Sequence, residues 1–344
     1  MDAEPKRVGI RDIAASCGLS ITTVSHALSG RRPVPAETRE RVLRTAAELG
    51  YQPNPQARAL RLGRSLTLAV QMAGAGGDAV LPDAAYFVDL LNGAAAEALH
   101  QGYALLLVPT AAPDRQMRRL HIDGAIVVDP TGNEGLLRSG AVPVVTTGRV
   151  PGAGSGDVPW VDNDFRAGTT LVLDHLLATG RRRPALIAGS PRQSYVADAI
   201  GAFAAWCHAR DLEPRIVHVD GPATDAAGAA AARELLASGD RPDAVHATLD
   251  RLAIGIAGAA LSMGLRIPED LAVTAGSDAP ALAFHRPPIT ALDLNPGDVG
   301  REAVAALIRR LEDRDDEQPR CVTVDTALVV RESTGPPGSA RADG

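Results

Sequence analysis

The fold of this chain is decided near its start by IRDIAASCGLSITTVSHALSG, residues 10–30. Gly18 supplies the permissive backbone that a tight turn requires, and Ser20 is a good N-cap for a helix over 21–28. A first helix over 10–17 is predicted by apolar residues at helical spacing, namely Ile10, Ile13, Ala14 and Cys17. Two helices joined by a tight glycine turn are typical of the helix-turn-helix unit.

A third helix, predicted over 36–49, completes this unit by packing the first two together. Gly50 is its C-terminal stop, and four of its residues are expected to be buried: Val42, Leu43, Ala46 and Leu49. In the second helix the residues expected to face inward are Val24, Ala27 and Leu28. The outward face then carries Ile21, Thr22, Ser25 and His26. The second helix of such a unit lies in the DNA major groove, where short polar side chains reach base edges.

The charge distribution agrees with a DNA-binding head. The net charge of the whole chain is −6, but residues 1–64 hold eleven Lys/Arg against six Asp/Glu and the remainder is strongly acidic. A basic head on an acidic body indicates that only the head meets a polyanion. A segment of this length can also be basic by chance, and charge alone favours neither interpretation over the other.

Residues 8–68 closely resemble the headpiece of the lactose-repressor (LacI/GalR) family, and TTVSHAL at 22–28 is especially like its purine-repressor branch. The resemblance implies that Ile21, Thr22 and His26 read the bases of an operator half-site, although Ile21 replaces the polar residues common at its position. The phosphate contacts that it implies are Ser20, Thr23, Ser25 and Arg32. A helix-packing hydroxyl is an equally good interpretation of Thr23.

The next segment, YQPNPQARALR at 51–61, resembles the hinge helix of the family. Its two prolines end the headpiece and begin a helix too short to be stable alone in water. In the family this helix folds only on operator DNA, and Leu60 matches the leucine that dimers wedge into the minor groove. A core role for Leu60 is the alternative, which the surrounding arginines disfavour. The other hinge contacts implied by the resemblance are Asn54, Ala57 and Arg61.

From Ser65 onward, apolar strand-like runs alternate with helical runs, which predicts parallel sheets with helices on both faces. Such sheets bind ligands beyond the carboxyl ends of their strands. The strands are expected at 66–71, 104–108, 124–128, 142–146, 185–188, 216–219, 244–247 and 272–274. The helices are expected at 86–101, 167–179, 196–210, 226–238 and 252–263.

This part also resembles the family, whose two-lobed sensor is shared with periplasmic sugar-binding proteins, through VDNDFRAG at 161–168 and PPITALDLNPGDVGREAV at 287–304. The expected fold is an all-α helix-turn-helix headpiece plus an α/β two-lobed periplasmic-binding-protein-like sensor domain. One lobe would span 65–162 with a returning helix near 297–313, and the other 163–293 with the last strand. The expected domains are headpiece 1–53, hinge and linker 54–64, effector-binding and dimerisation domain 65–334, and disordered tail 335–344.

The resemblance implies an effector site between the lobes at Tyr86, Phe87, Asp162, Ser194, Asp198, Asp250 and Asp278. The chain departs from the family pattern at Asp198, where an arginine is usual three residues before Gly201, and at Leu249, which replaces an asparagine before Asp250. It also has Gly221 where several members place an aromatic ring over the ligand. With carboxylates and no arginine expected nearby, an uncharged sugar or nucleoside, or else a cation, is favoured. The alternatives are that Asp198 faces solvent or that the ligand site is lost.

Other classes of protein, enzymes and exported solute-binding proteins, have weaker support in the sequence. Gly74 to Gly77 lacks the spacing of a phosphate-binding loop, no nucleophile elbow or zinc-protease motif occurs, and His121 beside Asp123 is more plausibly structural than metal-binding. Cys17, Cys207 and Cys321 are too far apart in sequence to suggest a metal site. An exported solute-binding protein would need a signal segment and no headpiece. We therefore expect a cytoplasmic, cofactor-free, non-enzymatic repressor, without membrane or metal partners, that binds near-palindromic double-stranded operator DNA as a homodimer and responds to a small-molecule effector.

Overall fold

The computed structural model describes residues 8–29, 33–51, 63–73, 85–109, 119–152, 158–314 and 320–335. Its internal contacts divide the chain into two compact units, Met1–Ser65 and Leu66–Gly344. Most of the predicted hinge (54–62) and nearly all of the predicted tail (336–344) lie outside the described residues. None of the described helices combines the length and the apolar character that a bilayer crossing needs.

The described part of the first unit holds three helices: α1 (Ile10–Cys17), α2 (Ile21–Ser29) and α3 (Ala36–Glu48). These bounds agree with the predicted ones to within one residue at each end. Gly18 adopts the left-handed backbone (φ 63°) that the tight turn requires and donates its N–H to Ala15. The core of the unit is formed by Ile13, Val24 and Val42, all fully buried, together with Ala14, Cys17, Ala27 and Ala46.

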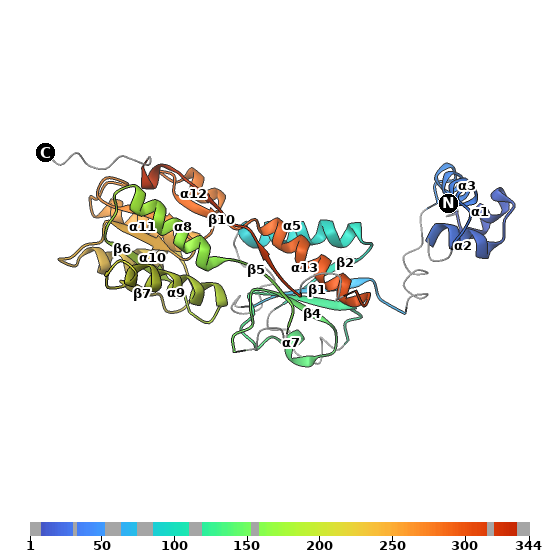
Figure 1. Cartoon of the computed structure of the whole chain (residues 1–344), viewed down its shortest axis with the longest axis horizontal. Coiled ribbons are helices and arrows are strands. Elements are labelled where there is room, and N and C mark those ends of the chain that lie inside the picture. The colour runs from blue at the N-terminus through green and yellow to red at the C-terminus, as the bar shows by residue number, and fades with distance from the viewer. Residues whose placement is uncertain are drawn as a thin grey trace, which may run out of the picture. The chain divides into compact units, whose positions relative to one another are not determined.

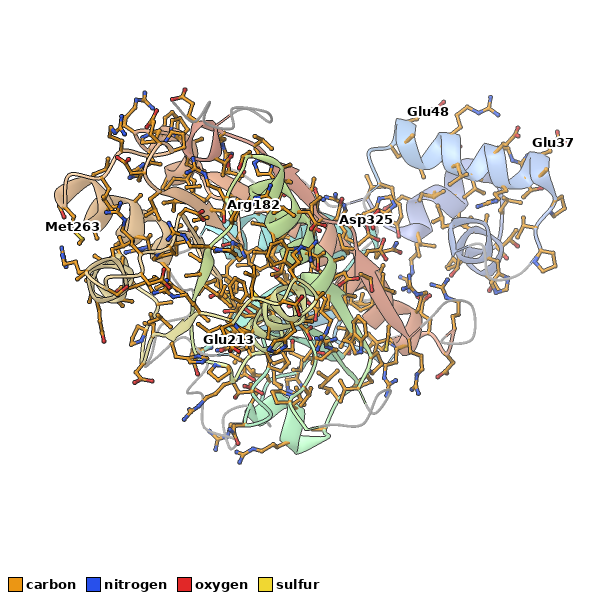
Figure 2. The ribbon with its side chains drawn as sticks, turned by 60° about the vertical axis from the view of Figure 1, so that its left-hand side comes forward. Glu37, Glu48, Arg182, Glu213, Met263 and Asp325 are labelled. Carbon is orange, nitrogen blue, oxygen red and sulfur yellow. The ribbon has the colours of Figure 1, made fainter. Side chains whose placement is uncertain are left out.

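Two predictions for α3 are wrong, because Leu43 is 45% exposed and Leu49 is 36% exposed. The buried face of α3 is the single row of Val42 and Ala46. Leu43 is turned about 100° away from that row, and no described helix of the unit covers it. Tyr51, beyond the helix end, packs against the core where Leu49 was expected. Figure 2 shows Glu37 and Glu48 near the two ends of α3, pointing away from the core.

The first lobe of the second unit is built on a parallel six-stranded sheet in the order β11-β5-β4-β3-β1-β2. The strands are β1 (Thr67–Met72), β2 (Ala104–Val108), β3 (Gly124–Val128), β4 (Val144–Thr147), β5 (Trp160–Asn163) and β11 (Cys321–Val324). Its helices are α5 (Ala85–His100), α7 (Gly135–Ser139) and α13 (Pro296–Leu311). Helices α5 and α13 lie side by side in Figure 1.

The second lobe has another six-stranded sheet, in the order β12-β10-β9-β8-β6-β7, in which only β12 is antiparallel to its neighbour. The strands are β6 (Pro184–Ala188), β7 (Ile216–His218), β8 (Ala244–Ala247), β9 (Ala272–Ala275), β10 (Thr290–Asp293) and β12 (Ala327–Val329). Its helices are α8 (Phe165–Ala178), α9 (Ser194–His208), α10 (Asp225–Leu236), α11 (Asp250–Ser262) and α12 (Pro280–Phe284), followed by a 3-10 turn at Glu332–Thr334.

The chain passes between the lobes more than once, as the resemblance implied. The returning helix is α13, which packs on the first sheet, and the last strand, β12, joins the second. Sequence patterns did not predict β5, β10 and β11, nor the five-residue helices α7 and α12, and they gave no bounds for the last strand, β12. β5 (WVDN) and β10 (TALD) end in polar residues, so neither is a continuous apolar run of the kind that predicted the other short strands.

Close helix pairing in each lobe depends on glycine. A Cβ added at Gly255 on α11 would overlap the carbonyl oxygen of Asp225 on α10, and one added at Gly300 on α13 would overlap that of Leu90 on α5. The backbones of these helix pairs therefore touch, and each pair forms one stiff layer against its sheet. This leaves the carboxyl ends of the strands as the place where side chains are free to form a site.

Candidate functional site

The outward face of α2 gathers four of the predicted DNA-contacting residues. Ile21 is 50% exposed and Thr22 is exposed, while Ser25 and His26 are half-buried on the same side of the helix. The opposite side is anchored by Val24 and Ala27 in the core of the headpiece, as predicted. One face of α2 is thus packed in the headpiece core, and the opposite face is accessible.

The start of α2 is fixed by Ser20, whose side chain acts as the predicted N-cap. The Thr23 backbone N–H donates to Ser20 Oγ at 3.0 Å, and the two hydroxyl oxygens lie 2.8 Å apart. Thr23 therefore has a structural role in the headpiece, which is one of its two predicted roles. Each hydroxyl retains capacity for a further hydrogen bond, so a phosphate contact by either residue stays a prediction.

The remaining predicted DNA contacts fall outside the part of the chain that the structure describes. They are Arg32, Asn54, Ala57, Leu60 and Arg61. Their roles on operator DNA stay predictions.

In the second unit, the first lobe brings polar side chains to the carboxyl edge of its sheet. Asp129 directly follows β3, Arg149 lies two residues beyond β4, and Asp162 is the third residue of β5. These three strands are neighbours in the sheet. Arg149 Nε lies 3.9 Å from Asp162 Oδ2, so the ends of β4 and β5 form one charged group.

The second lobe meets this group through the first turns of α9. The Arg149 backbone N–H donates to Ser194 Oγ at 3.1 Å, and its guanidinium forms an ion pair with Asp198. Arg166, on α8, binds the other oxygen of Asp198 at 2.9 Å. We call Tyr86, Asp129, Arg149, Asp162, Ser194, Tyr195, Asp198 and Asp250 the inter-lobe cluster.

The structure corrects the expectation that no arginine lies near the carboxylates, and it excludes the alternative that Asp198 faces solvent. Arginines are present, since Arg149 and Arg166 both pair with Asp198, and Asp198 is only 6% exposed rather than facing solvent. A buried carboxylate needs cationic partners, and here they come from a strand end and a neighbouring helix. The side-chain charge at Asp198 is therefore already neutralised within the protein.

Asp278, another predicted effector contact, is also satisfied within the chain. Its Oδ1 and Oδ2 accept from Arg331 at 2.9 Å and 2.7 Å, a bidentate pair. Arg331 also donates to the Ile289 carbonyl at 2.7 Å, so the pair is fixed against β10. The position of Gly221, where several family members place an aromatic ring over the ligand, is an exposed turn with φ 82°.

Aromatic side chains lie among the carboxylates. Tyr86 and Phe87 form an edge-on pair with ring centroids 5.3 Å apart at the start of α5, and Tyr86 packs against the apolar core of the second lobe. Tyr195, on α9, lies 5.5 Å from the ring of Phe165. Burial raises the pKa of Tyr86, and the charges of Asp129 and Asp162 raise it further. Burial likewise raises the pKa of Tyr195, with added contributions from Asp129 and Asp250, so these groups from both lobes are within electrostatic reach.

Burial raises the pKa of three carboxylates of the cluster. Burial, reinforced by the charge of Asp162, raises the pKa of Asp129 to about 7. Burial also raises the pKa of Asp162 to about 6, against the opposing effects of the Asn163 N–H and Arg149. The pKa of Asp250 is raised by burial, although the Ser277 hydroxyl and nearby N–H groups oppose the shift. Asp162 Oδ2 is buried and accepts no hydrogen bond, so it is available to a ligand that donates one.

Comparison with known proteins finds a matching family for each of the two units. Residues 9–54 match the family described as "Bacterial regulatory proteins, lacI family", and residues 173–334 match the "Periplasmic binding protein-like domain". The HTH-type transcriptional regulator CelR of Thermobifida fusca is 30% identical over 339 residues, which are 95% of this chain and 98% of CelR. The chain belongs to the LacI family.

Other relatives and solved structures agree. The HTH-type transcriptional repressor PurR of Haemophilus influenzae (strain PittEE) is 26% identical, over 94% of this chain and 98% of PurR. The CelR–cellobiose complex has a TM-score of 0.71 at 27% identity, over 95% of this chain and all of that one. The lac repressor dimer bound to operator and the anti-inducer ONPF has a TM-score of 0.69 at 22% identity, over 96% and 100%, and shows the fold alone.

The family and fold class expected from the sequence are thus confirmed, and this LacI-family chain is a DNA-binding transcriptional regulator with an effector-binding domain. Its relatives are regulators of transcription. Among its described residues, no three His, Cys, Asp or Glu side chains are grouped to hold a metal ion.

Five residues of the LacI-family sensor were missed by sequence reasoning: Asp129, Arg149, Arg166, Tyr195 and Arg331. A signal existed for the first two, because Asp129 directly follows a predicted strand and Arg149 comes three residues after another. Polar residues at the carboxyl ends of parallel strands are candidates for ligand contacts. Arg166 and Arg331 gave no such signal, since their partners are far away in the sequence.

Proposed function

We propose that this chain is a homodimeric repressor whose affinity for a near-palindromic operator is controlled by a sugar or related polyol bound between the lobes. The observation that carries the effector class is Asp162 Oδ2, a buried acceptor without a hydrogen bond at the carboxyl edge of the first sheet. Sugar hydroxyls donate hydrogen bonds, and a carboxylate accepts them strongly.

The operator is read by α2 in this proposal. Ile21, Thr22 and His26 meet base edges, while Ser20, Thr23, Ser25 and Arg32 meet phosphates. From the hinge, Asn54, Ala57 and Arg61 add contacts and Leu60 wedges into the minor groove. One short helix reads few base pairs, so two copies on a near-palindromic site are needed for useful specificity.

Dimerisation is supported by an exposed apolar stripe on α5. Val88 is 50% exposed and Leu99 is 77% exposed, and both lie on one side of the helix with Ala95 and Ala96. An apolar stripe of this kind marks a surface that another protein covers. The lac repressor structure is that of a dimer bound to operator, and a second copy of this chain is the occupant that we propose.

An anionic effector is disfavoured by the way in which the arginines are used. Arg149 and Arg166 pair with Asp198, and Arg331 pairs with Asp278. Asp129, Asp162 and Asp250 would repel a phosphate or carboxylate in a partly desolvated site. The relative CelR is described in complex with cellobiose, an uncharged sugar. Sugar contacts are assigned to Tyr86, Phe87 and Asp162, with Ser194, Asp198, Asp250 and Asp278 lining the opposite lobe.

Each segment of the chain has its own role in this proposal. Residues 1–53 bind DNA, 54–64 form the hinge, 65–334 bind the effector and the second copy, and 335–344 form a tail. The protein acts by binding rather than by catalysis, and operator DNA places its action in the cytoplasm. Since binding linkage is reciprocal, an effector that weakens operator binding also binds the operator complex more weakly.

The experiment is fluorescence anisotropy of a labelled operator duplex with the full chain, repeated with neutral sugars, nucleosides and organic acids. We expect a neutral sugar to change the operator Kd by about tenfold or more. Asp162→Asn should weaken this response, whereas the control Asp220→Asn, at an exposed turn, should preserve it. A response to organic acids alone, or to no compound, contradicts the proposed effector class.

A further inference from the structure

The inter-lobe cluster holds more negative charge than the protein itself neutralises. Asp198 is bound by two arginines and Asp278 by one. Asp129 has no ion pair among the described residues, and the nearest cation to Asp162 is Arg149, at 3.9 Å and already bound to Asp198. A buried charge without a partner is costly, so this part of the site favours a positively charged occupant.

Geometry places one of these carboxylates, Asp129, against the second lobe. Asp129 follows β3 with a left-handed backbone (φ 49°), which is uncommon for a residue other than glycine and is often found at functional sites. A Cβ built on Gly148 would lie 3.7 Å from Asp129 Oδ1 and 3.5 Å from Ser194 Oγ. Asp129 therefore lies beside the start of α9, at the boundary between the lobes.

The side chain that points to a ligand is Asp162. It is 7% exposed, its Oδ1 accepts from the Asn163 N–H at 2.9 Å, and its Oδ2 is buried with no hydrogen bond. Native proteins rarely leave such an atom without a partner. A bound group with several N–H donors and a positive charge would satisfy it.

The aromatic side chains are also suited to a cation. The rings of Tyr86 and Tyr195 lie within electrostatic reach of Asp129, the first from α5 and the second from α9. A cation near the face of a tyrosine ring is attracted to it, most strongly where water is excluded. Arg149 faces the same carboxylates, but its charge is matched by Asp198, and Arg166 is 62% exposed, where water screens it.

We propose that Asp129 and Asp162, together with Asp250 from the second lobe, bind an ammonium group of the effector, and that the effector is an amino sugar. This inference rests on the proposed function, because it specifies which sugar the same site takes. The sugar hydroxyls contact the remaining polar groups, and the ammonium group replaces the missing counter-charge. Both lobes contribute a carboxylate, so one ammonium group would favour their closure.

Binding of an ammonium group at Asp129 should release a proton. The raised pKa of Asp129, about 7, means that the empty site holds a proton near neutral pH. An ammonium group favours the ionised carboxylate and so expels that proton, whereas an uncharged sugar has no such effect. The groups that face Asp129 and Asp162 are Tyr86, Arg149, Asp164 and Tyr195, and Asp250 lies within electrostatic reach of Tyr195. Affinity for an amino sugar should therefore rise with pH across the range in which Asp129 titrates, as long as the amine stays charged.

The test is titration calorimetry of the full chain with two matched sets: glucose, glucosamine and N-acetylglucosamine form the first, and the corresponding β-1,4-linked disaccharides form the second. Each is measured in two buffers of different ionisation enthalpy, which reveals proton release. We expect the amino sugar to bind about tenfold or more tightly than its hydroxyl and acetamido counterparts, with proton release. Asp162→Asn should weaken binding of the amino sugar far more than binding of the uncharged sugar and so remove this preference, whereas the control Asp220→Asn should keep it.

Equal or tighter binding of the uncharged sugar, without proton release, overturns the ammonium site and leaves the proposed sugar effector intact. Binding of 1,4-diaminobutane as tightly as the amino sugar also overturns it, because the hydroxyls would then contribute nothing. If no member of the sets binds, the sugar effector itself is wrong. A preference for the amino sugar that is lost in Asp162→Asn supports both the ammonium site and the sugar effector.

Discussion

Arg149 of the first lobe and Asp198 of the second form an ion pair across the lobe boundary, and Arg166 binds the second oxygen of the same carboxylate at 2.9 Å. The Arg149 backbone adds a hydrogen bond to Ser194. Two contacts of one residue thus join the end of β4 to the start of α9. Any effector that changes the closure of the lobes must act on this connection.

The first prediction concerns that ion pair. Arg149→Met and Asp198→Asn should each lower the free energy of unfolding, and the two changes should not be additive, with a coupling of about 1 kcal/mol. The estimate is modest because the Arg149 side chain is 41% exposed. Urea unfolding of both single variants and the double variant gives the coupling. Full additivity would show that the pair contributes nothing in solution.

The second prediction concerns the cap of α2. Ser20→Ala removes the acceptor of the Thr23 N–H and should destabilise the headpiece by about 1 kcal/mol. Ser20→Asn is the matched control, because asparagine caps equally well. Hydrogen exchange of the α2 amides measures the effect in the full chain. If the alanine variant protects these amides as well as the parent does, Ser20 is not the cap in solution.

The third prediction separates base reading from affinity. His26 faces outward on α2, so His26→Ala should cost ~1–3 kcal/mol at one operator position and relax the base preference there. Arg61→Ala should weaken all sequences alike and reduce the salt dependence of binding. Binding to a set of single-base operator variants at several salt concentrations distinguishes the two. An unchanged sequence preference in His26→Ala would remove it from the reading surface.

The fourth prediction is a pH dependence. The folded pKa of Asp129 is about 7, above its ordinary value of 3.8, so the folded chain keeps a proton that the unfolded chain releases. Its contribution to stability is present at low pH and is lost as the pH rises through about 7. Asp129→Asn should flatten the fall in unfolding free energy between about pH 4 and 7 relative to the parent and to Asp220→Asn. An equal slope in all three proteins would mean that Asp129 titrates normally.

The sequence predicted the headpiece more closely than the effector site, for a physical reason. Its helices are bounded by local signals, the turn at Gly18 and the cap at Ser20, which act within a few residues. The partners of Arg149 and Arg331 are 49 and 53 residues away along the chain. Whether an arginine after a strand meets a carboxylate or solvent depends on how the lobes pack, and no local pattern records that.

Leu43 illustrates the same limit within the headpiece. Its helical spacing is compatible with a buried position, yet three short helices bury only one row of α3. The short strands β5 and β11 are likewise defined by pairing with each other, not by their own sequences. Local sequence thus predicted where the headpiece helices begin, and tertiary packing decided what they cover.

The most direct test of the central claim is selection of binding sites by the full-length protein from a random pool of DNA duplexes, followed by sequencing. A dimeric LacI-family repressor reading through α2 should enrich one near-palindromic sequence with two half-sites about one helical turn apart. His26→Ala should shift the same base in both halves. Enrichment of a single unrepeated half-site, or of no sequence at all, would contradict the account.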